Sequence, residues 1–321
     1  MGKIRILTTG GTIAMRELKP GDGAVPSLTG SDIRNLLPPD LPLVEAEEIC
    51  NLPGAHMTPD ILWKVRTRAL AAVQDSEVDG VVVTHGTDTL EETAYLLDLT
   101  IPGDKTIVFT GAMRAASEPG YEGPANLAAA VRVAAEPRTR GLGTLVVLND
   151  QIHAARHVTK THTLALDTFQ SPGWGPLGRV DMDKVFIAHR IQHKTLLCEA
   201  LETKVGLIKL GVGMEDDFLR CAIATGARGV VLEGLGAGRI PPWWLPGIRQ
   251  AISKGIAVVI TSRCSGGRIY DKYGFPGAYR DTRAAGAYFA SGFNGQKARI
   301  ALMVALGKGA PDNALDVVFE K

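Results

Sequence analysis

The sequence lacks an excess of either charge. Its 35 lysine and arginine residues are matched by 34 aspartate and glutamate residues, which leaves a formal net charge of +1. Proteins that bind nucleic acid or anionic membranes generally present a basic field, so we expect neither kind of partner. No apolar run is long enough to span a bilayer. The first residues, MGKIRILTT, enter a predicted strand with no apolar leader before it, so we expect a cytoplasmic protein.

Cysteine is also scarce, and the cysteines are scattered without a C-x-x-C pair: Cys50, Cys198, Cys221 and Cys264. A clustered zinc site or redox motif is therefore not expected, and we predict reduced, mostly buried thiols. His189 and His193 have the i, i+4 spacing of metal ligands. No acidic third ligand is placed with them, so we expect no metal site.

What the sequence does contain is an alternation of short apolar runs with amphipathic segments. Runs at residues 4–7, 81–83, 106–109 and 145–148 are rich in β-branched residues, and helical patterns separate the second, third and fourth of them. This alternation is typical of βαβ units, and continuous apolar strands are typical of a parallel sheet covered on both faces. We therefore expect a larger N-terminal α/β domain with a mostly parallel sheet at residues 1–184.

The pattern becomes polar and mixed at residues 185–204, which we interpret as a linker. Alternation then resumes, and it predicts a smaller parallel α/β domain at residues 205–321. The expected strands are residues 205–210, 229–232 and 257–261, and the expected helices are residues 217–224, 245–253 and 296–306. Within this domain we expect GLGAG at 234–238 to form a tight turn. Trp243 and Trp244 are expected to anchor a core or a subunit interface.

Two turns follow predicted strands with the same design of threonine, glycine and threonine. They read TTGGTIA at residues 8–14 and THGTDT at residues 84–89. Ligands of parallel sheets bind beyond the carboxyl ends of the strands, and glycine lets a backbone approach a ligand closely. Thr87 and Asp88 could instead serve only as caps of the next helix. Because the design occurs twice, we favour a binding or catalytic site.

A threonine hydroxyl is a weak nucleophile that needs a base, directly or through a second hydroxyl. The candidate bases lie in one polar segment and are Lys160, His153, His157 and His162. A lysine can act as a base only if its pKa is lowered from about 10.4. Spacing alone favours a surface position for Lys160.

These residues also carry a resemblance. TTGGTIA, THGTDTLEETAYLLDLT, GAMR and VTKTHT resemble the L-asparaginase family of threonine-nucleophile amidohydrolases, which includes the glutaminase-asparaginases. The similarity continues through SPGWGPLG and ASGFNGQKARIAL and so spans nearly the whole chain. It implies hydrolysis of a small-molecule amide without a cofactor. It also implies a homodimer or homotetramer in which a partner subunit closes each active site.

The resemblance further implies a role for each matching residue. Thr12 would be the nucleophile on a mobile loop, and Lys160 would draw the proton of Thr87. Asp88 would bind the α-ammonium group of the substrate. The backbone N–H groups of Thr87 and Ala112 would form an oxyanion hole, in which each donor contributes about 2.7–4 kcal/mol.

The chain departs from the family pattern at positions on the substrate side. The usual tyrosine of the first loop is replaced by Ala24 or Val25, and the usual serine and polar residue by Gly54 and Ala55. Ala237 stands where relatives have an asparagine. We therefore expect weakened contacts to the substrate and free space beside it.

Several readings stay open because of these departures. L-asparagine is the first expected substrate, and a bulkier or N-substituted asparagine is the alternative. A non-catalytic amide-binding protein is a second alternative, and a subunit of a tRNA amidotransferase is a third. Asp281 of a partner subunit would be one residue able to restore the missing contacts.

Overall fold

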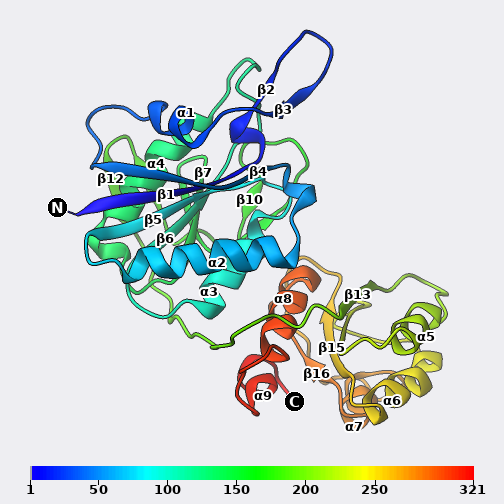
Figure 1. The fold of residues 1–321 in the computed structure, drawn as a ribbon. Coiled ribbons are helices and arrows are strands. Elements are labelled where there is room, and N and C mark those ends of the chain that lie inside the picture. The colour runs from blue at the N-terminus through cyan, green and yellow to red at the C-terminus, as the bar shows by residue number, and fades with distance from the viewer. Residues whose placement is uncertain (1) are drawn as a thin grey trace. The chain divides into compact units, whose positions relative to one another are not determined.

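The computed structural model describes residues 2–321, which form two compact units (Figure 1). The first unit runs to Thr195 and the second from Leu196 to Lys321. Residues 188–204 contain no helix or strand, whereas residues 185–187 of the expected linker belong to a strand of the first unit. No helix within residues 2–321 has the length and apolar character needed to cross a membrane.

The first unit is built on an eight-stranded sheet in the order β12-β11-β8-β7-β6-β5-β1-β4. Neighbours from β4 to β7 are parallel, and β8, β11 and β12 add an antiparallel edge. The predicted, mostly parallel sheet is thus confirmed. The strands are β1 (Lys3–Gly10), β4 (Val44–Leu52), β5 (Val78–Thr84), β6 (Thr106–Thr110), β7 (Thr144–Leu148), β8 (Gln151–Ala154), β11 (Gly178–Asp181) and β12 (Lys184–Ile187).

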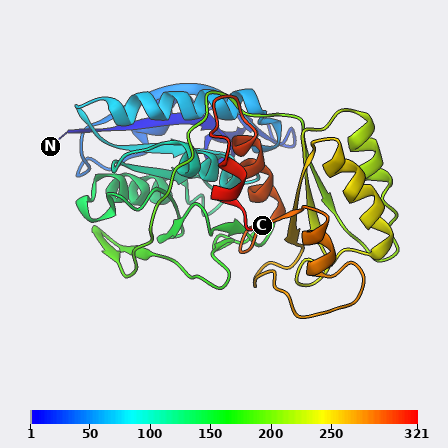
Figure 2. The same ribbon diagram turned by 90° about the horizontal axis from the view of Figure 1, so that it is seen from below.

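Helices cover both faces of this sheet (Figure 2). They are α1 (Gly30–Asn35), α2 (Pro59–Gln74), α3 (Leu90–Thr100) and α4 (Gly123–Ala135). The helices α1 and α4 share one core with the sheet, and α2 packs with α3 on the opposite face. The connections β4-α2-β5, β5-α3-β6 and β6-α4-β7 all advance in the same direction across the sheet. Because α4 lies on the face opposite α2 and α3, the β6-α4-β7 crossover has the opposite hand to the other two. Parallel crossovers rarely depart from one hand.

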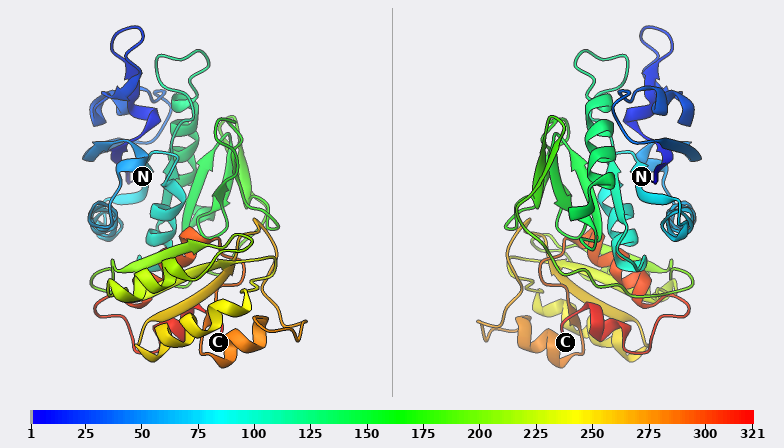
Figure 3. Two further views of the ribbon diagram at one scale, coloured as in Figure 1. Left: turned by 90° about the vertical axis from the view of Figure 1, so that its right-hand side faces the viewer. Right: turned by 90° about the vertical axis from the view of Figure 1, so that its left-hand side faces the viewer.

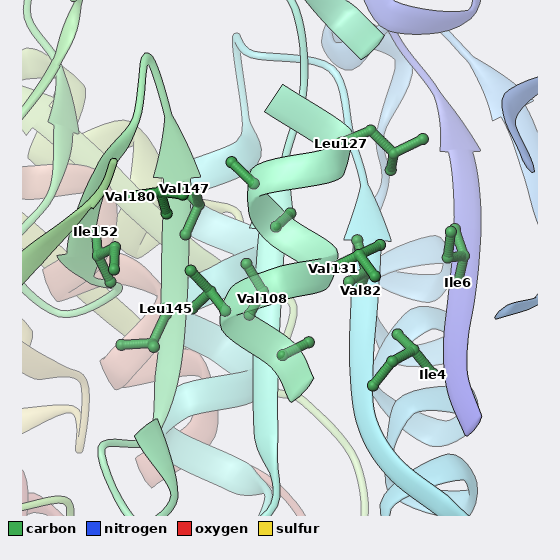
Figure 4. Close-up of a cluster of buried hydrophobic side chains, with 14 of the residues drawn as sticks. Ile4, Ile6, Val82, Val108, Leu127, Val131, Leu145, Val147, Ile152 and Val180 are labelled. Atoms are coloured by element: carbon green, nitrogen blue, oxygen red, sulfur yellow. The ribbon is translucent and has the colours of Figure 1, made fainter. Parts of the chain in front are cut away.

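The core beneath α4 is filled by alternate residues of these strands, because successive side chains of a strand point to opposite faces of the sheet. Ile4 and Ile6 of β1, Val82 of β5 and Val108 of β6 point toward Leu127 and Val131 of α4 (Figure 4). Ile4, Ile6, Val82 and Val108 are all fully buried. Burial of each such side chain stabilises the fold by about 1.5–3 kcal/mol. This core holds the strand ends that carry the candidate site.

Two small hairpins complete the first unit. One is formed by β2 (Met15–Glu17) and β3 (Ala24–Pro26), and the other by β9 (Thr159–Lys160) and β10 (Phe169–Gln170). The first hairpin follows Thr12, and the second contains Lys160 itself.

The second unit is a four-stranded parallel sheet in the order β13-β14-β15-β16, as predicted. The strands are β13 (Val205–Lys209), β14 (Gly229–Gly234), β15 (Ala257–Ser262) and β16 (Tyr288–Phe289). Figure 3 shows the helices that flank this sheet. They are α5 (Asp217–Ala224), α6 (Leu245–Ser253), α7 (Tyr279–Ala284), α8 (Gly295–Ala305) and α9 (Ala314–Val318). Trp244 is fully buried in the core of this unit, whereas Trp243 is 45% exposed.

Two smaller predictions have different outcomes. The expected tight turn at residues 234–238 is confirmed, because Leu235 and Arg239 form an antiparallel bridge around glycines with positive φ. The prediction of mostly buried thiols is wrong for Cys221 and Cys264, which are exposed. Cys221 lies on the exposed face of α5, and the periodicity of the sequence does not indicate whether a small residue such as cysteine occupies the buried or the exposed face.

Candidate active site

The site forms where parallel strands of the first unit end at a common edge (Figure 1). Thr12 follows β1, Gly54 and Ala55 follow β4, Thr87 and Asp88 follow β5, and Ala112 follows β6. Parallel strands bring their carboxyl ends to the same side. The sheet order β6-β5-β1-β4 therefore makes neighbours of loops that are far apart in the sequence.

Three glycines let these loops touch. A Cβ atom built on Gly11 would lie 2.3 Å from the N and Cα atoms of Gly86, and one built on Gly86 would lie 2.6 Å from the Cα atom of Gly54. No side chain fits at such separations, so backbone packs directly on backbone. Thr12 and Thr87 each come one residue after this contact, which brings their backbones together.

The turn that carries Thr12 is held from the loop after β6. Gly11 has φ 76°, which favours glycine, and Thr12 begins a short 3-10 turn. Tyr121 donates its hydroxyl hydrogen to the Ile13 carbonyl at 2.7 Å, and Ala116 N–H donates to the Met15 carbonyl at 2.8 Å. Burial raises the pKa of Tyr121 to about 12, so the hydroxyl remains a donor at neutral pH. Sequence analysis did not identify Tyr121.

Lys160 lies between the two polar residues after β5. Its Nζ atom is 2.9 Å from Thr87 Oγ1 and 2.8 Å from Asp88 Oδ1. The Lys160 side chain is only 17% exposed, whereas that of Asp88 is 62% exposed. The surface position that spacing alone favours for Lys160 is therefore wrong. The geometry couples an amine to a hydroxyl at the floor of the site and leaves a carboxylate at its rim.

Two backbone donors complete the site. Gly111 packs against the Thr87 side chain, since its Cβ would lie 3.4 Å from Thr87 Cγ2, and Ala112 is fully buried beside it. Within residues 2–321, no hydrogen bond uses the backbone N–H of Thr87 or of Ala112. Unused N–H groups beside a hydroxyl are what an oxyanion hole requires.

The histidines considered as alternative bases have other partners. His153 pairs with Ser171 and Gln151, His157 stacks on Trp174 at 4.2 Å, and His162 Nδ1 accepts hydrogen bonds from Leu164 N–H and Ala165 N–H. Lys160 is the candidate base that contacts a threonine hydroxyl of the site. Within residues 2–321, no group of three His, Cys, Asp or Glu side chains is arranged to hold a metal ion.

His85 supports the site from below, although sequence analysis gave it no role. It is fully buried, its Nδ1 lies 2.9 Å from the Gly86 carbonyl, and its Nε2 lies 2.9 Å from Thr93 Oγ1. A carbonyl only accepts, so Nδ1 carries the hydrogen and Nε2 accepts from Thr93. Burial lowers the pKa of His85 to about 4, so the ring is neutral at pH 7. This neutral ring fixes the Gly86 carbonyl next to Thr87.

His85 should make stability depend on pH. The pKa of His85 is about 4 in the folded chain and 6.5 in its ordinary state. Between these pH values the unfolded chain binds more protons than the folded chain does. The contribution of the neutral His85 to the free energy of unfolding is therefore complete above pH 6.5 and is lost as the pH falls toward 4. The loss is at most about 3 kcal/mol. We expect His85→Gln to be less stable than wild type at pH 7 in urea unfolding, by a margin that shrinks at pH 4.5. A margin independent of pH would contradict a buried neutral ring.

The other residues at which the chain departs from the family pattern lie in several different parts of the structure. Ala55 is exposed, as are Ala24 and Val25 of β3. Ala237 and Asp281 belong to the second unit, where Asp281 Oδ2 accepts from Gly277 N–H at 2.8 Å. At Gly54 a side chain would meet Gly86 backbone atoms at 3.2–3.3 Å. A side chain at Gly54 would therefore contact the Gly86 backbone tightly, and its absence leaves little free space on that side of Gly54.

Comparison with known families gives two matches that together span nearly the whole chain. Residues 3–193 match the family model described as asparaginase, N-terminal. Residues 204–319 match the model described as glutaminase/asparaginase C-terminal domain.

Individual proteins agree with these models. An L-asparaginase of Bacillus licheniformis is 36% identical over 308 residues, covering 95% of each chain. A glutamyl-tRNA(Gln) amidotransferase component of Methanosarcina mazei is 34% identical, covering 95% of this chain and 74% of that protein. The crystal structure of a probable cytoplasmic L-asparaginase from Campylobacter jejuni superimposes with a TM-score of 0.83 at 31% identity, covering 95% of each chain.

Proposed function

The chain belongs to the asparaginase family of amidohydrolases, and on this premise we propose that it hydrolyses the side-chain amide of L-asparagine to aspartate and ammonia. The observation that carries the proposal is the contact of Lys160 Nζ with both Thr87 Oγ1 and Asp88 Oδ1. An amine held against a hydroxyl is the arrangement that activates a threonine for acyl transfer.

The proposed reaction proceeds through an ester on Thr12. Thr12 Oγ1 forms a bond to the amide carbon, and its proton passes through the Thr87 hydroxyl toward Lys160 Nζ. The N–H groups of Thr87 and Ala112 stabilise the oxyanion. The carbon–nitrogen bond then breaks and the proton leaves with the nitrogen as ammonia. Water next attacks the ester, which releases aspartate and restores the Thr12 hydroxyl.

Substrate recognition would depend mainly on Asp88 and on backbone. Lys160 engages Asp88 Oδ1, so Oδ2 is the oxygen that would accept from the α-ammonium group. The Gly54 backbone N–H would donate to the α-carboxylate, because Gly54 lies in the glycine contact beside Thr87. Ala55 supplies no hydrogen-bonding group on its side chain.

This recognition predicts weak binding of free asparagine. Gly54 and Ala55 offer no side-chain hydrogen bonds, and each bond to a charged group is worth about 1.5–3 kcal/mol. Loss of two such bonds weakens binding by a factor of about one hundred or more. We expect a millimolar KM for L-asparagine, or a preference for asparagine substituted on its α-amino or amide nitrogen. Glutamine should be a poorer substrate. A low micromolar KM would contradict the predicted loss of contacts.

The test of the proposed function is ammonia release from asparagine, glutamine, their D-forms and N-substituted derivatives. Release from asparagine or a derivative that Thr12→Ala abolishes would support hydrolysis at this site. Binding of asparagine without ammonia release would favour a non-catalytic amide-binding protein. Ammonia release that appears only with a charged tRNA and its partner proteins would favour the function named for the Methanosarcina mazei relative.

We further propose a homodimer or homotetramer with shared active sites. The proposal rests on the family resemblance, because of the two tryptophans expected at an interface Trp244 lies in the core and Trp243 is only half-exposed. Light scattering at micromolar concentration should give the mass of a dimer or tetramer. A fully active monomer would contradict shared sites.

A cytoplasmic location is also proposed, and it agrees with the location in the name of the Campylobacter jejuni protein.

A further inference from the structure

The strand that carries Lys160 is short. The β9–β10 hairpin pairs only two residues on each side, and residues 161–164 of the loop that connects the two strands are exposed. A two-residue hairpin has little stability of its own. The 2.9 Å contact between Lys160 Nζ and Thr87 Oγ1 therefore requires an additional support for the Lys160 backbone.

Glu91 provides such a support from the first turn of α3. Its side chain is buried, with 5% of the residue exposed. Its Oε1 atom accepts from Thr159 Oγ1 at 2.9 Å and from the Lys160 backbone N–H at 3.4 Å. A buried carboxylate is retained only with hydrogen-bond partners, and bonds to a charged acceptor are the stronger ones. Glu91 thus joins α3 to β9.

Glu91 lies only a few residues after Thr87 and Asp88 in the sequence, so the hydrogen bonds of Glu91 connect these site residues to the strand of Lys160. Thr87 and Asp88 lie in the segment that leads directly into α3, which begins at Leu90. The segment 87–91 therefore carries the hydroxyl and the carboxylate and, through Glu91 in the first turn of α3, also binds the strand of the lysine. A displacement of about 1 Å in a catalytic group can cost about a hundredfold in rate.

We propose that Glu91 is a positioning residue that holds Lys160 against Thr87; this inference rests on the proposed function. Glu91 acts through Lys160 and not on the substrate. Its removal should therefore lower kcat and leave KM nearly unchanged. Glutamine at position 91 keeps an Oε1 acceptor for the same two donors and should restore most of the rate.

The experiment compares four variants by steady-state kinetics and thermal midpoint. Glu91→Ala should lower kcat about thirtyfold to a hundredfold with KM within about threefold of wild type. Glu91→Gln should stay within about fivefold of wild-type kcat, and Thr159→Val, which loses one donor to Glu91, should fall between them. Asp104→Asn removes one negative charge at the exposed residue beyond the other end of α3 and should leave kcat unchanged.

A double-mutant cycle with Lys160→Met separates positioning from a general structural role. If Glu91 acts through Lys160, Glu91→Ala should cost less than about threefold in kcat in the Lys160→Met background. Equal costs in both backgrounds would overturn the proposal. A folded Glu91→Ala variant with wild-type kcat would also overturn the proposal. If Glu91→Ala does not fold, a folded Thr159→Val variant with wild-type kcat would overturn it instead. Either result would leave the proposed function standing if Lys160→Met alone lowers kcat by at least about a hundredfold. A wild-type chain that releases no ammonia from any amide would overturn both.

Discussion

Replacing Thr12 with alanine is expected to abolish amide hydrolysis with little change in stability. The proposed nucleophile is a single oxygen atom, and the turn that presents it is fixed by Gly11 and by hydrogen bonds to Ile13 and Met15. None of these contacts uses the Thr12 side chain. Loss of a nucleophile should lower kcat by at least about a thousandfold, which corresponds to about 4 kcal/mol of barrier.

The Thr12→Ala experiment requires both turnover and unfolding to be measured. Thr67→Ala on the exposed side of α2 is the matched control for loss of a threonine side chain and should keep wild-type turnover. A Thr12→Ala variant that keeps more than about a tenth of wild-type kcat has lost less than about 1.4 kcal/mol of barrier stabilisation. That effect is too small for a missing nucleophile, and the assignment of Thr12 would be wrong.

Lys160→Met should have the second largest effect, and the loss should lie in the chemical step. Methionine keeps an apolar stem in the 17% exposed position but cannot exchange a proton with Thr87. General acid–base catalysis by one side chain contributes about a hundredfold to ten-thousandfold. We therefore expect kcat and kcat/KM to fall together by that amount, because the lysine acts as charge moves in the transition state.

The matched control for Lys160→Met is Lys184→Met on the edge strand β12, where the lysine side chain is 71% exposed. It should leave both kinetic constants unchanged. A rise in KM at unchanged kcat for Lys160→Met would indicate that the lysine only organises Asp88 for substrate binding.

The parts of the fold that the sequence predicted are those with continuous apolar strands. Strands β1, β5, β6 and β7 are buried on both faces, so their runs of valine, isoleucine and leucine stand out. The edge strand β4 reads VEAEEICNL and is buried at only two of its nine positions. Its acidic residues conceal it from any criterion based on apolar runs.

The helix α2 was also not predicted, although local signals were present. Thr58 accepts a hydrogen bond from Ile61 N–H, Pro59 occupies the first turn, and Leu62, Val65, Ala69 and Ala72 are buried at helical spacing. The handedness of the α4 crossover has no local signal at all, because it depends on which face of the sheet α4 covers.

The candidate site divides in the same way. The sequence predicted Thr12, Thr87 and Asp88 because glycine turns at strand ends are a local pattern. Supporting residues were missed because their contacts are distant in sequence: Tyr121 bonds a residue 108 positions away, and Glu91 bonds one 68 positions away. His85 bonds a residue only eight positions away, but a buried neutral histidine and an exposed one look alike in sequence.

The most direct test of the account is to identify the residue that carries the acyl group during turnover. The enzyme is mixed with L-asparagine or its best-hydrolysed derivative, quenched in acid within milliseconds and mapped by peptide mass spectrometry. The account predicts an aspartyl ester on the peptide that contains Thr12, absent from the Thr12→Ala variant. An ester on the peptide that contains Thr87 would contradict the assignment of Thr12 as nucleophile and of Thr87 and Lys160 as its activating pair.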